Sequence, residues 1–302
     1  MDSVKVGLTG AGGFIGRLLA ERLAERNHEL VLVDPVRHPA RDTLAVDYAS
    51  PEGLAALADC EVVVHLAAIS GILSCARDPV GARRTNISGL CALADELQSR
   101  QTPLLFASSF SVVGSPTVLP IFEDAPFSPL NEYARQKTAG EMVVRSLGPA
   151  GRVLRMSNIY GTYPLNDRTY RKGNVLSLFV EQARAGRLRI NAPGTQARDF
   201  LHVEDAVRHW IAAAERAGRG EDPGATYHLA SGEVWSVRGL AEELQKLLPA
   251  RVPEEVVANP REESLLSDFR IDTRSTRRRL GIEPIHSVLE TLRAELASPP
   301  NP

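Results

Sequence analysis

The 302-residue sequence predicts an α/β protein built around a doubly wound parallel sheet, and three observations support this prediction. Short apolar runs have the continuous character of buried parallel strands. They alternate with segments whose apolar residues repeat at helical spacing, and a glycine-rich turn joins the first strand to the first helix. Strands that alternate with helices form βαβ units, so we expect a Rossmann-like sheet.

The first half of the chain carries most of the predicted strands. The first strand begins at Val4, and the helix after the glycine turn begins at Phe14. A long helical stretch is expected from Asp78 to Arg100, and a further helix carries Tyr133. The remaining apolar strands are expected at 30–33, 62–66, 104–107 and 153–155.

The alternation weakens in the second half. The Pro- and Gly-bearing stretch 160–173 predicts a long polar loop, where binding functions are often carried. Helices are expected to resume at 175–185, 203–217 and 237–248 and near the C-terminus. The helix at 203–217 has one apolar face, typical of packing on a core, formed by Val207, Trp210, Ile211 and Ala214.

The composition is that of an ordinary globular protein, with 43% hydrophobic and 24% charged residues and a net charge of −2. There is no basic surplus that would indicate a nucleic-acid partner. Three cysteines without CxxC or Cys/His spacing predict neither a disulfide framework nor a metal site. Met1 is followed almost at once by a strand, leaving no room for a signal peptide, and no apolar stretch approaches about 18 residues. We therefore expect a cytoplasmic protein that contacts no membrane.

The glycine turn predicts a dinucleotide site. Gly10, Gly13 and Gly16 form G-x-x-G-x-x-G between a strand and a helix. Glycines there permit a tight turn and close backbone approach, and the helix N-terminus at Phe14 and Ile15 offers amide donors to a pyrophosphate. The strand before the turn and the helix after it supply the context that this motif requires.

Asp34 ends the second strand, where a carboxylate can accept hydrogen bonds from an adenosine ribose and repel a 2′-phosphate. This favours NAD over NADP. Arg37 and Arg41 lie near enough to accommodate a phosphate, and Asp34 can alternatively be a turn former before Pro35. Asp47 is a second acid that could reach the adenine, or it has a purely structural role.

Tyr133 and Lys137 are four residues apart at the start of a predicted helix, so their side chains project from one face. A phenol with an ordinary pKa of about 10 is a poor base near neutral pH. A neighbouring ammonium and a positive nicotinamide ring would favour the phenolate, which could then take a hydroxyl proton as hydride leaves carbon. Y-x-x-x-K carries weight here only because it follows a glycine turn in a βαβ domain.

Ser108 and Ser109 follow the strand at 104–107, at the carboxyl edge where doubly wound sheets place their ligands. A hydroxyl at this edge could bind a substrate oxygen and share its proton with Tyr133. Serines after a strand also commonly cap helices and turns, and that alternative stays open.

Six motifs occur in order along the chain, at Thr9–Gly16, His65–Ala68, Asn86–Gly89, Ser108–Gly114, Tyr133–Lys137 and Arg198–Val203. Together they resemble the extended short-chain dehydrogenase/reductases, in particular the NAD-dependent nucleotide-sugar epimerase/dehydratase branch, from about Val4 to Pro284. The resemblance implies a Rossmann NAD-binding domain, mainly residues 1–155. It implies a smaller, mostly helical substrate-binding region, mainly 156–302, with some segments that return to the Rossmann domain.

The resemblance also implies roles for single residues. Tyr133 would be the catalytic acid/base, Lys137 would bind the nicotinamide ribose, and Ser109 would be the substrate-oriented hydroxyl. Asn86 would support the active-site helix. The motif after the third strand would place Leu66, Ala67 and Ala68 beside the cofactor. The chain departs from the family at Val113, usually tyrosine, and at Gln136, usually serine.

For the substrate, the resemblance implies that Asn158 meets a diphosphate and that Arg198 and Arg261 clamp it. An arginine fork suits this role because it makes charge-assisted, bidentate bonds to phosphate oxygens. Two alternatives remain open: Arg198 could pair with Asp199, and Arg261 could be solvated surface.

The reaction type is argued from groups that the sequence lacks. A 4,6-dehydratase needs an additional acid and base, which the resembling enzymes carry immediately after the catalytic hydroxyl, where this chain has Phe110 and Ser111. Epimerisation at sugar carbon 4 needs only oxidation, rotation of the keto sugar and return of hydride. We therefore expect a nucleotide-sugar 4-epimerase. A 4-ketoreductase or dehydrogenase, or a non-catalytic dinucleotide-binding protein, remains as an alternative. The resemblance further implies a homodimer through the 78–100 stretch and the helix of Tyr133.

Overall fold

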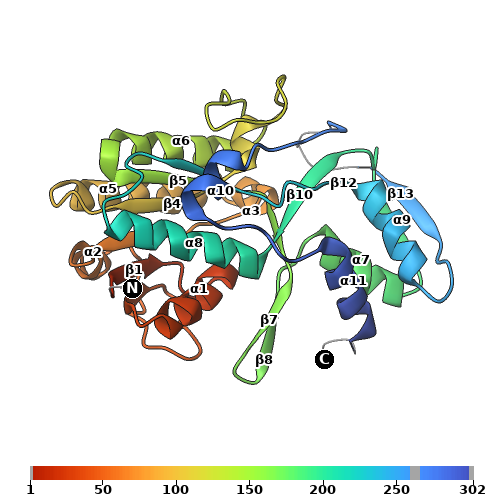
Figure 1. The fold of residues 1–302 in the computed structure, drawn as a ribbon, viewed down its shortest axis with the longest axis horizontal. Coiled ribbons are helices and arrows are strands. Elements are labelled where there is room, and N and C mark those ends of the chain that lie inside the picture. Colours follow the sequence, from red (N-terminus) through yellow and green to blue (C-terminus); the bar gives the residue numbers. More distant parts are fainter. Residues whose placement is uncertain (1–2, 259–265, 299–302) are drawn as a thin grey trace.

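The computed structural model describes residues 3–258 and 266–298, and its centre is a parallel six-stranded sheet (Figure 1). The strand order is β11-β5-β4-β3-β1-β2. The order reverses direction beside β1, and this crevice is where doubly wound sheets bind ligands. The strands are β1 (Lys5–Thr9), β2 (Glu29–Val33), β3 (Val62–His65), β4 (Leu104–Ser109), β5 (Gly151–Met156) and β11 (Thr226–Leu229). The predicted α/β fold with a parallel sheet is confirmed.

Helices cover both faces of this sheet, which explains why its strands are apolar on both sides. Alternate residues of one strand enter different cores: Val62 and Val64 pack with α1 (Phe14–Glu25) and α8 (Val203–Gly218), and Val63 packs on the other face. That other face is covered by α2 (Pro51–Ala58), α5 (Gly89–Gln98) and α6 (Glu132–Ser146).

The helical stretch predicted between Asp78 and Arg100 is divided. Asp78 caps α4 (Pro79–Arg83), a π-helical turn follows at Arg84–Ser88, and α5 then runs to Gln98. A short helix, α3 (Ile72–Arg77), precedes this stretch. π-Helical turns inside helices are frequent at functional sites, and this one carries Asn86.

Two elements from the second half of the chain return to the central sheet. β11 pairs in parallel with β5 and forms the sheet edge. The α8 face predicted to be apolar packs on α1, with Val207, Trp210, Ile211 and Ala214 at 2% exposure or less. α10 (Arg274–Leu280) lies beside α8, as Figure 1 also shows, and contacts β11.

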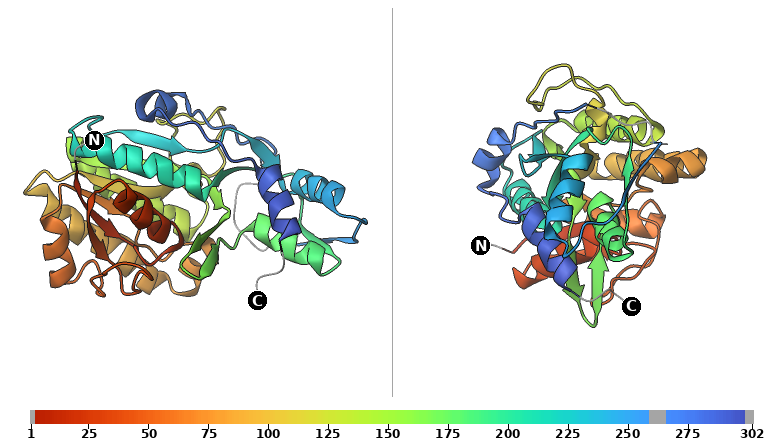
Figure 2. Two further views of the ribbon diagram at one scale, coloured as in Figure 1. Left: turned by 60° about the horizontal axis from the view of Figure 1, so that its bottom comes forward. Right: turned by 90° about the vertical axis from the view of Figure 1, so that its right-hand side faces the viewer.

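The remaining C-terminal elements gather at one end of the molecule (Figure 2). α7 (Val175–Arg184), α9 (Val237–Leu247) and α11 (Val288–Ala297) share one apolar core. Small sheets accompany them, so this region is less purely helical than predicted. β10 (Ala197–His202) lies between β6 (Asn158–Tyr160) and β12 (Val234–Ser236), and β9 (Leu188–Asn191) pairs with β13 (Glu254–Val257).

The prediction of a long polar loop at 160–173 is wrong. The segment is a β-hairpin of β7 (Thr162–Leu165) and β8 (Arg168–Arg171), joined by a two-residue turn. Asn166 in that turn has a φ of 52°, a left-handed conformation that Asn tolerates and that tight hairpins use. The hairpin has polar side chains on its solvent side, and these made the alternating pattern of its two strands difficult to recognise in the sequence. In the described part of the chain, no helix combines the length and apolar character needed to cross a bilayer.

Candidate active site

The glycine turn forms a cradle at the N-terminus of α1. Gly10 has a φ of 76°, and a Cβ there would lie 2.6 Å from the backbone nitrogen of Ala67. A Cβ on Gly16 would lie 2.0 Å from the carbonyl oxygen of Gly10. Gly13 is the N-cap, and among the described residues no side chain caps the first turn. The amides of Phe14 and Ile15 are therefore presented at a helix end that favours an anion, so the turn fits a dinucleotide pyrophosphate.

Asp34 lies next to this turn. Its Oδ1 accepts the Val36 amide hydrogen at 2.7 Å and would lie 3.1 Å from a Cβ on Gly12. The nearby Arg41 binds both carboxylate oxygens of Glu21, at 2.8 and 2.9 Å. That ion pair engages one of the two arginines that could have received a 2′-phosphate, which supports the preference for NAD.

Asp47 has a local partner instead. Its Oδ1 accepts the Ala49 amide hydrogen at 2.9 Å, and Ser50 then caps α2. This turn gives Asp47 a structural role, and its contact with the adenine stays a prediction.

The end of β3 closes the cradle. Leu66 donates its amide hydrogen to the Thr9 carbonyl at 3.2 Å, and Ala67 donates to Thr9 Oγ1 at 3.3 Å. His65 Nδ1 is 2.8 Å from the same hydroxyl, and burial lowers the pKa of His65 to about 3, so this ring stays neutral. The structure therefore brings Leu66 and Ala67 against Gly10, and the contact of Leu66, Ala67 and Ala68 with the cofactor stays a prediction. The role of His65 was missed.

α6 brings Lys137 to the carboxyl edge of β4. A Cβ on Gly140 would lie 2.4 Å from the Phe106 ring, so glycine lets this helix lie directly on the strand. Lys137 Nζ donates to the Ala107 carbonyl at 2.6 Å and lies 6.0 Å from the centre of the Tyr133 ring. The first turn of α6, which carries Tyr133, is capped by Asn131, whose side chain accepts from the Ala134 amide at 2.9 Å.

The structure distinguishes the two candidate serines. Ser108 is buried and donates to Glu141 Oε1 at 2.6 Å, so its hydroxyl belongs to the core. Ser109 lies beside the Tyr133 hydroxyl, where it acts to lower the pKa of the phenol. The cluster at the sheet edge is therefore Ser109, Tyr133 and Lys137, the three residues expected from the sequence.

Burial sets the protonation of the tyrosine and the lysine. It raises the pKa of Tyr133 to about 12, against the lowering effect of the Ser109 hydrogen bond. It lowers the pKa of Lys137 to about 8. The predicted effect of Lys137 on the phenolate is therefore outweighed by desolvation in the protein without cofactor. A positive nicotinamide ring remains as the charge that can lower the pKa of Tyr133.

A buried amide network supports this cluster. Asn86 accepts the Ile69 amide hydrogen at 2.8 Å, donates to the Ile69 carbonyl at 2.9 Å and donates to Gln136 Oε1 at 2.7 Å. Gln136 in turn donates to Glu132 at 3.0 Å. Asn86 thus ties the segment after β3 to α6, and it does so through the glutamine that departs from the family pattern.

The expected substrate contacts lie on the small sheet. Asn158 is exposed at the start of β6 and donates to the Asp199 carbonyl at 3.0 Å. Arg198 lies opposite Trp235 in β10 and β12 and donates to the Ala197 carbonyl at 2.6 Å. The Asp199 carboxylate accepts from Ser231 and Gly232. Arg261 lies outside the described residues.

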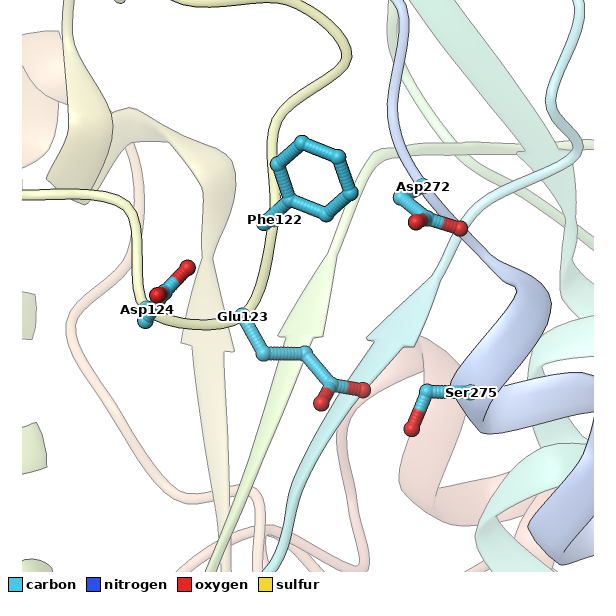
Figure 3. Close-up of a pocket in the computed structure, with 5 residues that line it drawn as sticks. All are labelled: Phe122, Glu123, Asp124, Asp272 and Ser275. Atoms are coloured by element: carbon cyan, nitrogen blue, oxygen red, sulfur yellow. The ribbon is translucent and has the colours of Figure 1, made fainter.

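A separate shallow pocket lies between the loop after β4 and α10, lined by Phe122, Glu123, Asp124, Asp272 and Ser275 (Figure 3). Its carboxylates would repel a nucleotide diphosphate. None of Ser109, Tyr133 and Lys137 lines it, so it is distinct from the cluster at the sheet edge.

Comparison with known proteins agrees with this arrangement. Residues 6–230 match the NAD dependent epimerase/dehydratase family, and the chain belongs to that family. The UDP-glucose 4-epimerase of Mycolicibacterium smegmatis is 28% identical over 92% of this chain and 92% of its own. The structure of TunA, an NAD-dependent NDP-hexosamine 5,6-dehydratase, is 26% identical, with 97% of each chain covered and a TM-score of 0.81. The structure of UDP-glucose 4-epimerase from Thermotoga maritima is 22% identical, with 97% of each chain covered. Its TM-score of 0.83 shows that the two chains share the fold.

The protein is therefore an NAD-dependent enzyme of the epimerase/oxidoreductase type, and the predictions of family, cofactor and enzymatic character are confirmed. The fit of the cofactor rests on the cradle itself, since a Cβ at Gly10 or Gly16 would close it.

The lowered pKa of Lys137 predicts a gain in stability for Lys137→Met in NAD-free protein. The folded state lowers this pKa to about 8 from 10.5, so the unfolded chain binds more protons between these values. The loss of stability from burying the ammonium is fully present below pH 8 and is absent above pH 10.5. Urea unfolding should show the variant more stable than the parent at neutral pH, with a difference that shrinks as pH rises. The exposed Lys246→Met is the control, and parallel pH curves for Lys137→Met and its parent would contradict the prediction.

Proposed function

We propose that this enzyme epimerises a nucleotide-diphosphate sugar at carbon 4 through a transient 4-keto sugar. The observation that carries the proposal is the cluster of Ser109, Tyr133 and Lys137 at the same carboxyl edge of the sheet as the glycine cradle. Phe110 and Ser111 stand where a 4,6-dehydratase would need an acid and a base. Phe110 is buried at 4% exposure, edge-on to the ring of His228, and offers no proton-transfer group.

In this mechanism Tyr133 takes the proton of the sugar 4-hydroxyl as carbon 4 is oxidised. It returns a proton to the same oxygen when the keto group is reduced from its opposite face. Ser109, beside the Tyr133 hydroxyl, orients the sugar oxygen. Lys137, held by the Ala107 carbonyl, keeps a positive charge near the phenol and binds the nicotinamide ribose. NAD, when bound, supplies reversible hydride acceptance.

Residues 1–155 are proposed as the NAD-binding domain and 156–302 as the main source of substrate contacts. Asn158, Arg198 and Arg261 would bind the diphosphate, since arginine forks match phosphate oxygens. The similarity to UDP-glucose 4-epimerases supports a UDP-hexose as the first substrate to test.

Proton NMR on a panel of UDP-, dTDP- and GDP-sugars, with catalytic NAD and no reductant, tests the reaction. We expect a second anomeric sugar signal without net formation of NADH. Loss of the signals at carbons 5 and 6 would instead indicate a dehydratase, the activity named for the similar TunA structure. Turnover that needs stoichiometric NAD(P)H and a 4-keto sugar would indicate a ketoreductase.

Tyr133→Phe tests the proton-transfer residue. It removes the hydroxyl and keeps the ring, so turnover should fall by about 100- to 10,000-fold while NAD binding is retained. Met142→Leu, exposed on the same helix, is the control and should leave both unchanged. Undiminished turnover in Tyr133→Phe would contradict the assignment.

We also propose a cytoplasmic homodimer formed through α5 and α6. The described cysteines, Cys60, Cys75 and Cys91, are free thiols, which suits a reducing compartment. Light scattering on the eluting protein should give twice the chain mass of 32.8 kDa, and a single-chain mass would contradict the dimer.

A further inference from the structure

The β7–β8 hairpin contacts the dinucleotide turn directly. The Tyr163 hydroxyl donates to the Phe14 carbonyl oxygen at 2.5 Å, and the two ring centres are 5.2 Å apart. Tyr163 is 1% exposed, so its side of this contact is shielded from solvent. Phe14 is the first residue of α1, whose amides form the anion-binding end of the cradle. The hairpin therefore fixes the helical turn that would hold a pyrophosphate.

Two further contacts extend along the same binding motif. Tyr170 stacks on Tyr163 with ring centres 5.6 Å apart, and the Arg17 guanidinium lies 4.7 Å above the Tyr170 ring. At the hairpin tip, Asn166 Nδ2 donates to the Pro39 carbonyl at 3.3 Å. Pro39 belongs to the loop that follows Asp34. The hairpin thus connects the phosphate end of the motif with the loop after its ribose-binding acid.

The register of the hairpin explains how it makes these contacts. Tyr163 and Tyr170 are direct partners across β7 and β8, so they share the face toward α1. Arg171, one residue further along, has its guanidinium paired with Glu295 of α11 at 3.0 Å and with Glu181 of α7 at 3.4 Å. One side of the hairpin holds the cofactor turn while the other is anchored in the C-terminal region.

We propose that the β7–β8 hairpin is a brace that holds the dinucleotide turn in its binding geometry and keeps NAD bound between turnovers, with Tyr163 as the positioning residue. Fixed amide donors bind without first being ordered, so less ordering entropy is lost on binding. The inference deepens the proposed function, on which it rests: an epimerase must return hydride from the same NAD, whereas a dehydrogenase must release it.

Two variants test the brace. Tyr163→Phe keeps the ring and removes the hydroxyl that binds Phe14. Asn166→Gly removes the amide that binds Pro39, and glycine accepts the φ of 52° at that position. Thr169→Ala is the control, because Thr169 is exposed on the same hairpin. NAD content of the purified holoprotein and its rate of NAD loss after dilution would be measured without any sugar present.

We expect NAD to dissociate about tenfold faster from Tyr163→Phe, the loss of one hydrogen bond at a buried group, and severalfold faster from Asn166→Gly. Saturating NAD should restore the turnover number of both variants, which a general loss of structure would not permit. Equal NAD dissociation rates in both variants and in Thr169→Ala overturn the brace, as does free exchange of NAD in the parent protein. If Tyr163→Phe fails to fold, the NAD dissociation rate of Asn166→Gly, at the exposed tip of the hairpin, decides whether the brace exists. Tight NAD with every sugar unchanged would overturn the epimerase proposal and leave the brace standing.

Discussion

The direct seating of α6 on β4 is the constraint on which the candidate active site depends. Only glycine at position 140 leaves room for the Phe106 ring, and this closeness lets Lys137 reach the Ala107 carbonyl. One residue further along, Glu141 is fully buried and binds Arg155 through two hydrogen bonds of 2.9 Å. Leaving a buried charge unpaired costs about 3–5 kcal/mol, so this pair holds the helix in one position. The positions of Tyr133 and Lys137 therefore follow from core packing.

The same burial shapes the chemistry. Desolvation raises the pKa of Tyr133 to about 12 and lowers that of Lys137 to about 8, so at neutral pH, before the cofactor binds, the phenol is neutral and Lys137 still carries its proton. A site in this state is poorly suited to proton abstraction until a further positive charge enters. The cradle at Gly10 and Gly16 would hold the pyrophosphate of a dinucleotide whose nicotinamide ring supplies that charge. Cofactor binding and activation of the tyrosine are thus coupled through electrostatics, and a brace that retains NAD would retain the active state of the base.

The reaction class depends on few positions within a shared fold. The chain is similar both to UDP-glucose 4-epimerases and to a 5,6-dehydratase, so the architecture alone does not choose between them. Phe110 and Ser111 remove the acid and base of a 4,6-dehydratase and leave the groups that reversible oxidation at carbon 4 requires. A sheet edge with one phenol, one hydroxyl and one ammonium would suffice for that reaction, and the proposed epimerisation rests on it.

The sequence by itself determined the parallel α/β fold, the glycine turn, the acid Asp34 at the end of the second strand and the position of Tyr133 and Lys137 on one helix face. It could do so because strand patterns, turn chemistry and helical spacing each act over a few residues. Only the tertiary structure decided which serine faces the tyrosine, that Asn86 binds Gln136, and that desolvation outweighs the lysine charge on the phenol. It also turned the segment 160–173 into a hairpin, since Tyr163 and Tyr170 gain their partners on α1, about 150 residues away in the chain. Such contacts depend on register and packing between distant segments, which no local pattern records.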